Sequence, residues 1–518
     1  MVQRPTTSPH RILFLSTLAF TVCFAAWMIN GVLVTFLVNN GVFKWNSLEI
    51  GWLLGVPVLI GSVMRLPVGM LTDKFGGKWV MTAILLISAI PLYFLSTATS
   101  YGTFLLLSFG FGIAGSAFAA GVAYTSLWYP KEKQGTALGI FGAGNIGAAL
   151  TTLLAPNILN SLTHNNTNLD AWRNLPQLYS ALLVVVAVLF LVFAQNKKPS
   201  EIKSFSQRLA PLKQARVWRF GLYYFVVFGS FIALTQWLIP YYVNVYSMSI
   251  VTAGFMTTAF NLPSGIVRIA GGVLSDKVGA RTVLYWVFGT CLVCLILLIP
   301  PRVEIRTPGQ GIMATKSGII TVVSDSLIVV QSGIPEEGKI IFPLYTKGKG
   351  VDHVSIRFGM HHDSEGFLFL PTALSWQEPV VKEGDNVSKG QLIAKGITLI
   401  YFQANKWIFS GLVFIVGIMF GIGSAAVFKH ISTYYPKDIG TVGGIVGVLG
   451  GLGGFFDPIL FGYLLTITGV WTTCWVFLAI ITLISVTFMR LAIAYTKVGV
   501  FSVPKETIEQ NKMINPDR

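Results

Sequence analysis

The sequence has few charged residues. Asp, Glu, Lys and Arg make up only 11% of its 518 residues, whereas an average soluble domain contains about 25%. Hydrophobic residues account for 53%, and the mean hydropathy is +0.68. This composition excludes a soluble enzyme of several domains and indicates a protein embedded in the lipid bilayer.

Cysteine and histidine are also scarce, at four and six residues. All four cysteines lie inside apolar runs, and Cys291 and Cys294 have neither a second cysteine pair nor a histidine nearby. Packing explains them better than a metal or redox site. The run His361-His362-Asp363 could bind a metal, but three adjacent polar residues more often form a loop. We therefore predict no metal site and no cofactor.

Acidic residues are outnumbered by basic ones. The sequence contains 37 Lys and Arg against 21 Asp and Glu, which gives a net charge of +16. The cations lie mainly in short loops beside apolar segments, where they set the orientation in the membrane. No basic face remains for phosphates, so we predict that the protein does not bind nucleic acid.

Twelve apolar runs are long enough for membrane helices, which need about 20 residues each. Six spans are followed by a polar linker, three more spans, a long polar stretch and a final three spans. The runs are 12–39, 47–70, 78–98, 101–128, 135–161, 176–194, 217–246, 250–273, 281–300, 407–433, 439–466 and 470–494. The first run has no small-residue cleavage site, so we expect a retained helix rather than a signal peptide.

The charges of the loops predict the orientation. Even-numbered loops carry cations such as Lys74 and Lys277, whereas odd-numbered loops offer little beyond Lys44 and Arg173. Positive residues favour the cytoplasmic side, so we expect both termini in the cytoplasm and the long polar stretch on the opposite face. The protein would lie in the plasma membrane, which is the inner membrane of a bacterium.

A repeated loop motif divides the spans into two halves. The motif Gly-x-x-x-Asp-Lys-x-Gly follows span two with Asp73 and span eight with Asp276, 203 residues later. An acid at a helix end with cations nearby can latch neighbouring helices in one conformation. The pattern resembles the signature of the major facilitator superfamily, whose twelve helices form two six-helix halves around a central site.

Two glycine-rich spans reveal an insertion in the second half. Gly144 in span five and Gly450 in span eleven are 306 residues apart, whereas the two loop motifs are 203 residues apart. The difference of 103 residues equals the length of the polar stretch at 301–403. Missing side chains let helices approach closely, so we expect these glycines to act in helix packing and gating. They are Gly142, Gly144 and Gly147 in span five and Gly447, Gly450, Gly451, Gly453 and Gly454 in span eleven.

The predicted fold is an all-α membrane protein with a small, mostly β, extracytoplasmic insert. Its parts are an N-terminal six-helix half (1–196), a cytoplasmic linker (197–219), a C-terminal half (220–300 and 404–495), the insert (301–403) and a cytoplasmic tail (496–518).

β-Branched stretches at 319–323 and 327–330 predict strands in the insert. Residues 379–396 resemble the barrel-sandwich hybrid fold of biotinyl and lipoyl domains, although the surroundings of Lys316 do not suit modification. The insert is interpreted as a periplasmic lid or as a docking module for an unidentified extracytoplasmic partner.

Two arginines inside apolar spans are the main candidates for a binding site. Arg65 and Arg268 are also 203 residues apart, and each lies eight residues, about 12 Å, before its loop acid. A charge this deep is costly and suggests function; the alternative is an arginine that snorkels or is structurally paired. Two facing guanidinium groups repel unless an anion lies between them, and their planar forks suit carboxylate, phosphate or nitrate-like oxygens. We expect a small anionic substrate.

Aromatic residues occupy related positions in the two halves. Phe24 in span one and Phe228 in span seven are 204 residues apart, Phe118 is in span four, and Tyr224 precedes Phe228 by one turn. Aromatic faces above and below a planar anion would limit its thickness, and Tyr224 could donate a hydrogen bond. Packing against lipid or core is the alternative for any single aromatic residue.

Together these residues resemble the nitrate/nitrite porter family of that superfamily. The matching features are the two arginines, Trp27 after Phe24, Gly-Ala-Gly-Asn-Ile-Gly in span five, and Gly-Gly-Leu-Gly-Gly-Phe-Phe in span eleven. The resemblance covers all twelve spans. It implies that the two arginines clamp the anion, that the four aromatic residues shape the pocket, and that Asn145 contacts the anion.

Two ionisable residues in the last spans could couple transport to protons. Lys429 lies in a run that resembles the branch of the family associated with nitrate uptake for assimilation, and a lysine in a low-dielectric cavity can lose its charge. The alternative is an interfacial lysine. Asp457 is the only acid deep in an apolar span and departs from the family pattern. It could pair with a cation, carry a proton, or form a local hydrogen bond where Pro458 interrupts the helix.

The leading interpretation is a secondary transporter, not an enzyme, that moves nitrate, nitrite or both by alternating access. Proton symport stays open, and so does nitrate/nitrite exchange, because an empty carrier with two unneutralised arginines could not easily return. Another small anion, such as a short carboxylate, is the alternative among transporters. A sensor or assembly platform that uses the insert is the alternative outside them.

Overall fold

The computed structural model describes residues 8–199, 209–300, 303–334, 338–345, 355–358, 372–402, 405–435 and 439–497. At 131–136, 303–304, 355–358, 372–374, 401–402, 439–440 and 493–497 it describes the backbone alone. The motif His361-His362-Asp363, part of the linker and nearly all of the tail lie outside the described residues. The chain separates into two units, one formed by 300–409 and the other by the remainder.

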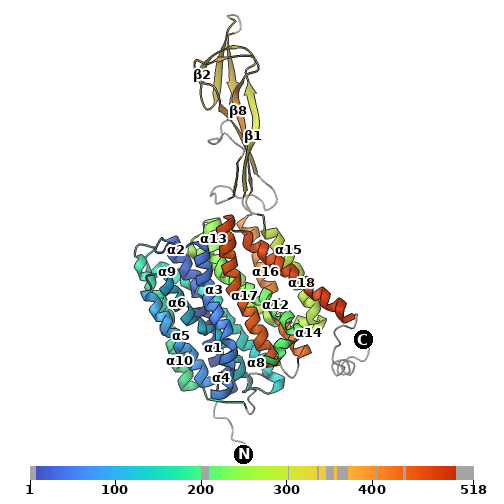
Figure 1. Ribbon diagram of the computed structural model, residues 1–518. Coiled ribbons are helices and arrows are strands. Elements are labelled where there is room, and N and C mark those ends of the chain that lie inside the picture. Colours follow the sequence, from blue (N-terminus) through green and yellow to red (C-terminus); the bar gives the residue numbers. More distant parts are fainter. Residues whose placement is uncertain are drawn as a thin grey trace, which may run out of the picture. The chain divides into compact units, whose positions relative to one another are not determined.

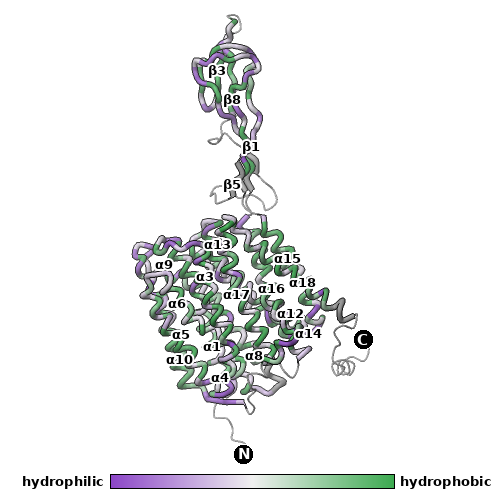
Figure 2. Tube along the Cα trace, viewed as in Figure 1, coloured by the Kyte–Doolittle hydropathy of each residue, from purple (hydrophilic) through white to green (hydrophobic). Residues whose placement is uncertain are grey.

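The larger unit is a helical bundle (Figure 1). Its described residues contain twelve segments long and apolar enough to cross a membrane, and each overlaps one predicted run. Figure 2 shows hydrophobic residues along these helices and polar residues gathered toward their ends. Spans two and eight run five residues past their predicted ends, to Phe75 and Val278, so that Asp73 and Asp276 lie in the last helical turn. The predicted twelve-span fold is confirmed.

The N-terminal half contains α1 (Pro9–Trp27), α2 (Ile29–Asn39), α3 (Ser47–Val63), α4 (Arg65–Phe75), α5 (Gly77–Phe94), α6 (Tyr101–Phe111), α7 (Ala117–Ser126), α8 (Lys131–Gly142), α9 (Ile146–Leu162) and α10 (Asn174–Phe193). The C-terminal half contains α12 (Ala215–Tyr224), α13 (Ser230–Tyr246), α14 (Ile250–Val278), α15 (Ala280–Leu298), α16 (Lys406–Tyr434), α17 (Ile439–Thr468) and α18 (Thr473–Lys497). Short 3-10 turns are η1 (Leu95–Thr97), η2 (Gly112–Ser116), η3 (Ala143–Asn145), η4 (Leu169–Arg173) and η5 (Ala210–Lys213), and η6 (Phe225–Gly229) is a π-helical turn.

Five spans are broken along their length. Spans one and two break at Met28 and Met64, spans four and five at η2 and η3, and span seven at η6. Irregular turns release backbone hydrogen-bonding groups, and transporters use them where a substrate site lies near the midplane. Four of the predicted anion-binding residues lie in or directly beside these breaks: Arg65, Asn145, Tyr224 and Phe228.

The repeated loop motif ends its helices in the same way in both halves. Gly76 after α4 has φ +93° and Gly279 after α14 has φ +86°, a conformation that residues with a Cβ rarely adopt. The other ends of these spans begin with polar caps, a capping box of Asn46 and Glu49 at α3 and the Ser249 hydroxyl at α14. Local sequence signals therefore set where both spans start and stop.

The two halves contact each other near the end of the bundle that carries the odd-numbered loops, called the odd-loop end below; the opposite end is the even-loop end. Gln236 Nε2 donates a hydrogen bond to the Leu54 carbonyl at 3.1 Å. The hydroxyl oxygens of Thr152 and Thr258 are 2.9 Å apart. Both contacts join an N-terminal helix to a C-terminal helix, so the bundle is closed on the odd-loop side.

Helices α3 and α17 pack backbone to backbone in the same region. A Cβ at Gly55 would lie 2.6 Å from the Phe455 carbonyl oxygen, and one at Gly51 would lie 2.5 Å from that of Pro458. Only glycine permits this approach. A cavity of about 300 Å³ opens at the odd-loop end, and none of the predicted site residues lines it; its wall includes Trp45, Asn46, Trp237, Asn244 and Trp471.

The smaller unit is built from strands. They are β1 (Val303–Met313), β2 (Gly318–Val323), β3 (Leu327–Ser332), β4 (Lys339–Pro343), β5 (Ser355–Phe358), β6 (Thr372–Pro379), β7 (Asn386–Val387) and β8 (Leu392–Phe402). They form two four-stranded antiparallel sheets with the orders β5-β1-β8-β6 and β4-β3-β2-β7. The strands predicted at 319–323 and 327–330 are β2 and β3.

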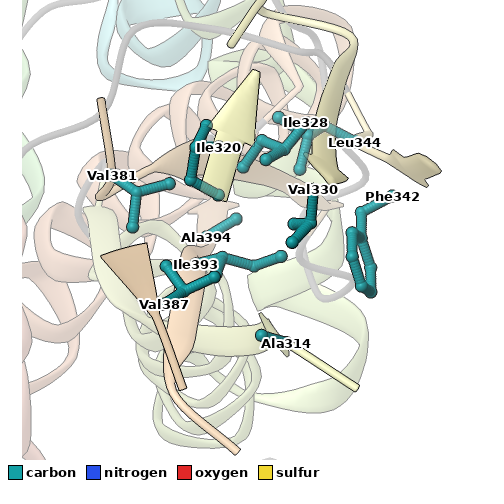
Figure 3. Close-up of a cluster of buried hydrophobic side chains, with 10 residues drawn as sticks. All are labelled: Ala314, Ile320, Ile328, Val330, Phe342, Leu344, Val381, Val387, Ile393 and Ala394. Carbon is teal, nitrogen blue, oxygen red and sulfur yellow. The ribbon is translucent and has the colours of Figure 1, made fainter. Parts of the chain in front are cut away.

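Figure 3 shows the apolar core of this unit. Side chains alternate along a strand, so β2 and β3 turn Ile320, Ile328 and Val330 inward. Strands β1 and β8 pair Val303 with Phe402, which places the two ends of the insert side by side. The unit thus has its own core and leaves the helical bundle through two adjacent chain segments.

Candidate anion site

Arg65 is the first residue of α4, directly after the break at Met64, and only 4% of its surface is exposed. Its Nη1 donates a hydrogen bond to the Gly447 carbonyl of α17 at 2.8 Å, across the boundary between the halves. The other two guanidinium nitrogens, Nε and Nη2, are buried and have no hydrogen-bond partner. These nitrogens form one edge of the planar group, which can bind two oxygens of a single anion.

Asn145 is a second buried residue with unpaired polar atoms. It is the last residue of η3, its side chain is buried, and neither Oδ1 nor Nδ2 has a hydrogen-bond partner. Buried polar atoms almost always have partners, and each one left unpaired costs about 1–3 kcal/mol. Such atoms are expected where a protein binds a polar ligand.

Arg268 lies in the unbroken helix α14 and is partly exposed. The guanidinium carbon of Arg268 is 5.4 Å from the centre of the Phe228 ring, and that of Arg65 is 5.3 Å from it. The two guanidinium carbons are therefore no more than 10.7 Å apart, and the two cations repel each other. Tyr224 lies within hydrogen-bonding reach of Arg268.

Aromatic rings surround the arginines. Besides Phe228, the rings of Phe118 and Trp27 lie 5.5 and 5.8 Å from the Arg65 guanidinium carbon. Tyr224 stacks on Phe228 with a centroid separation of 4.8 Å and an interplanar angle of 9°. The cations thus meet ring faces, an attractive arrangement that also shields them from lipid.

Phe24 lies behind Trp27 and is separated from Arg65 by that ring. Its ring is 5.5 Å from those of both Phe20 and Trp27, and it is Trp27 that faces Arg65. The predicted pairing of Phe24 with Phe228 across the site is therefore not symmetric in this structure. Phe228 touches both guanidinium groups, whereas Phe24 supports Trp27 from behind.

The glycines of span eleven lie against two different helices. A Cβ at Gly450 would collide with the Tyr224 ring, and one at Gly451 would collide with the Ser62 hydroxyl. Gly453 against Gly229 and Gly454 between Ile232 and Val58 are also tightly packed, whereas a Cβ at Gly447 would make only an ordinary contact with the Arg65 guanidinium, at 3.6 Å. Span eleven is therefore wedged between spans two and seven.

The glycines of span five differ from one another. Gly144 lies against the Phe20 ring and Gly147 against the Thr21 carbonyl of α1. Gly142 has open space where a Cβ would lie. Close packing therefore accounts for Gly144 and Gly147 in this conformation but not for Gly142.

Lys429 and Asp276 form an ion pair at the even-loop end, with Nζ and Oδ1 2.5 Å apart. Asp276 lies in the last turn of α14, where the helix dipole disfavours a negative charge, so a cation nearby is favourable. The side chains are 41% and 60% exposed, so Lys429 does not lie in the low-dielectric cavity that a proton carrier would need. Asp73 occupies the matching turn of α4.

Asp457 of α17 is fully buried and accepts a hydrogen bond from the Ser230 hydroxyl at 2.7 Å. Ser230 is the first residue of α13, directly after the π-helical turn. Among the described residues no cation pairs with Asp457, so the local hydrogen bond is the interaction that the structure shows.

Several residues of the site carried little signal in the sequence. Ser62 lies three residues before Arg65, one turn away, and could have been found from helical spacing. Phe20 lies four residues before Phe24 in α1 and could have been found in the same way, whereas Ser230 has no candidate residue one turn away. The Gly447 carbonyl could not have been found, because every residue carries the same backbone oxygen. Among the described residues no cluster of His, Cys, Asp or Glu could hold a metal ion.

Comparisons with known proteins agree on the type of protein. The family model described as Major Facilitator Superfamily matches residues 15–327. A probable nitrate/nitrite antiporter of Thermus thermophilus is 35% identical over 93% of this chain and 91% of its own length. A nitrite extrusion protein of Bacillus subtilis is 32% identical over 60% of this chain and 76% of its own.

A solved structure shares the fold at low identity. A bacterial homologue of the human lysosomal transporter Spinster, in an inward-facing and occupied conformation, is similar with a TM-score of 0.60 at 13% identity, covering 94% of this chain and 97% of that one. The relatives are named as transporters rather than enzymes, and the chain is a multi-pass membrane protein. With its paired arginines and both glycine-rich spans, the chain belongs to the nitrate/nitrite porter family of the major facilitator superfamily.

Proposed function

We propose that the protein carries nitrate, nitrite or both across the membrane by alternating access, with the anion held between Arg65 and Arg268. The observation that carries this proposal is the unpaired Nε/Nη2 edge of Arg65. An edge of two parallel N–H donors matches two oxygens of a planar oxyanion. The names of the relatives, which include nitrate and nitrite, agree with this choice.

Electrostatics supports a monovalent anion between the arginines. Two cations no more than 10.7 Å apart repel each other, and an anion between them converts the repulsion into two attractions. The stacked rings of Tyr224 and Phe228 narrow the space beside the arginines. A flat anion of few atoms suits this space better than a bulky one, and the unpaired amide of Asn145 would supply a further donor.

The closed odd-loop end represents one state of the alternating-access cycle. The contacts of Gln236 with Leu54 and of Thr152 with Thr258 would separate when the halves rock. The close glycine contacts of α17 would then allow the helices to slide. The Lys429–Asp276 pair joins α16 to α14 within the C-terminal half, so it would hold these two helices together while the halves move. The loop charges favour an orientation with the even-loop end and both termini in the cytoplasm, in which the insert would act outside as a lid or docking module.

Two modes of coupling fit this arrangement. In nitrate/nitrite exchange, the empty carrier cannot return because its two cations are not neutralised. In proton symport, a proton moves with the anion and a protonatable residue holds it. Both modes require the same pair of arginines.

The test is transport by purified protein in liposomes. We expect labelled nitrate to enter vesicles that contain nitrite, and unlabelled nitrate or nitrite to compete with it more strongly than formate or acetate. The matched control is the double variant Arg65→Lys, Arg268→Lys, which keeps both charges but removes both planar forks. Stronger competition by a short carboxylate would replace nitrate as the substrate, and no uptake of any anion would favour a sensor.

A further inference from the structure

Asp457 is a buried acidic residue that does not belong to the proposed anion site. Its side chain has no exposed surface, Oδ2 accepts a hydrogen bond from Ser230, and Oδ1 has no hydrogen-bond partner. It is neither one of the anion's donors nor an ion-pair partner of any described residue. The carboxyl group lies between α17 and the start of α13, where a Cβ at Gly453 would lie 2.9 Å from the Gly229 Cα.

The helices packed against α17 bring apolar or hydroxyl side chains to this region. Gly454, one turn before Asp457, lies between Val58 of α3 and Ile232 of α13. The ionisable groups on the neighbouring helices engage other partners. Of the charged ones, Glu49 caps α3 and Arg65 donates a hydrogen bond to the Gly447 carbonyl. The uncharged ones are Tyr224 beside Arg268, Tyr241 packed on Trp475, Tyr242 donating to Ser410, and Cys474 at the Trp471 carbonyl. Arg490 of α18 is exposed. An ionised Asp457 would therefore be buried without a counter-charge, which is strongly unfavourable, whereas a protonated carboxyl would not be.

We propose that Asp457 is the proton-binding site of this carrier, and that the proton and the anion bind cooperatively and move together. This inference rests on the proposed function and decides between its two modes of coupling. The closed odd-loop end buries the carboxyl group, so that state holds a proton on a carboxylate oxygen. No bond other than the O–H bond forms or breaks.

A short structural path joins the proton site to the anion site. Ser230 follows Phe228 by two residues, and the π-helical turn η6 ends between them. The ring of Phe228 lies against both guanidinium groups, so a change at Ser230 acts directly on the residue that both arginines contact. The hydrogen bond from Ser230 to Asp457 thus connects the protonation state of the carboxyl group to the position of the anion pocket.

The sign of the coupling follows from charge. Ten residues of α17, about 15 Å, separate Asp457 from the carbonyl at which Arg65 is held. At that distance and an effective dielectric constant of 20, a negative Asp457 would weaken anion binding by about 1.1 kcal/mol, or about sixfold. Linkage is reciprocal, so a bound anion strengthens proton binding by the same factor, and loss of the anion favours loss of the proton. This is the sign of symport.

The experiment compares two driving forces in the same proteoliposomes. One measures exchange of external labelled nitrate for internal nitrite at equal pH, and the other measures net uptake driven by an inward proton gradient with no anion inside. We expect the wild-type protein to perform both. We expect Asp457→Asn to lose gradient-driven uptake by at least about tenfold, while exchange falls by no more than about threefold. The matched control is Thr482→Val, which removes a buried hydroxyl from α18 and should leave both modes intact.

Each result has a distinct meaning. Gradient-driven uptake that survives in Asp457→Asn overturns the assignment, as does a wild-type protein that exchanges but shows no gradient-driven uptake. A wild-type protein that moves neither anion in either mode refutes the proposed function itself. If Asp457→Asn is inactive in both assays, a second measurement on the wild-type protein decides. Nitrate is added to the detergent-solubilised protein, and proton uptake is followed with a pH indicator. Proton uptake supports the assignment of Asp457, and the absence of proton uptake overturns it.

Discussion

Arg65 and Arg268 occupy equivalent positions 203 residues apart, yet the two halves of the molecule hold them differently. Arg65 follows a helix break, is almost completely buried and donates a hydrogen bond to the opposite half. Arg268 lies within a continuous 29-residue helix, is partly exposed and interacts with Tyr224 of its own half. Repetition of the sequence thus placed two arginines at one site without giving them the same environment.

The same asymmetry appears in the helices. Four of the broken spans belong to the N-terminal half, and span seven is the broken one among the described spans of the C-terminal half. Broken helices place backbone groups and side chains at mid-depth, whereas continuous helices transmit rigid-body motion. The helix breaks at the candidate anion site therefore come mainly from the N-terminal half, whereas the C-terminal half contributes Phe228, Tyr224 and the Gly447 carbonyl around the arginines.

The largest effect should come from Arg65→Lys. Lysine keeps the charge but cannot both hold the Gly447 carbonyl and offer a bidentate edge, so we expect the rate of nitrate exchange at low substrate to fall about 100-fold. Arg281→Lys is the matched control, because this arginine is exposed and donates to the Tyr434 hydroxyl. An Arg65→Lys protein with more than half of the wild-type rate would contradict the clamp.

Gly55→Ala should be almost as damaging. The new methyl group would lie 2.6 Å from the Phe455 carbonyl oxygen, so α3 and α17 must separate and the odd-loop end cannot close fully. We expect exchange to fall at least about tenfold, because each turnover requires closure. Gly289→Ala, on α15 with open space beside its Cα, serves as the control. Equal rates for the two variants would show that this contact is not needed for transport.

Arg268→Lys should have a smaller effect than Arg65→Lys. The positive charge stays, and the hydrogen bond between the halves is untouched, so we expect about a tenfold rise in KM for nitrate with little change in kcat. Initial rates over a range of nitrate concentrations separate the two parameters. A loss equal to that of Arg65→Lys would mean that the two arginines contribute equally to nitrate transport, and that the difference between their environments does not affect transport.

The ion pair between Lys429 and Asp276 should contribute little to stability. Exposed pairs are worth at most about 1 kcal/mol and weaken in salt. We expect Asp276→Asn, Lys429→Gln and the double variant to lower the unfolding temperature in detergent by similar small amounts, with the coupling energy lost at high salt. A coupling of several kcal/mol would indicate a latch much stronger than its exposure suggests.

Excision of the insert should change transport least. Val303 and Phe402 are paired neighbours, so a short Gly-Ser linker can replace the chain between them, and the insert has its own apolar core. We expect nitrate exchange in liposomes to stay within about twofold, as a docking module predicts. A large change in exchange rate would instead identify the insert as a lid on the pathway.

The sequence by itself determined the twelve spans, the repeat, the pair of arginines and the place of the insert. These features depend on local or periodic signals, such as the length of apolar runs, helix caps and equal spacing of motifs, which survive without knowledge of distant contacts. It also placed Asn145 and Phe228 among the candidates, and both lie at helix breaks.

Only the tertiary structure decided how these residues are used. The free edge of Arg65 exists because a backbone carbonyl 382 residues away occupies Nη1, and a backbone oxygen leaves no trace in the sequence. Likewise, Trp27 rather than Phe24 faces Arg65, Lys429 meets Asp276 in an exposed pair, and Asp457 meets Ser230 instead of a cation. Which groups are left unpaired depends on contacts between helices far apart in the chain, and those unpaired groups are where the anion and the proton would bind.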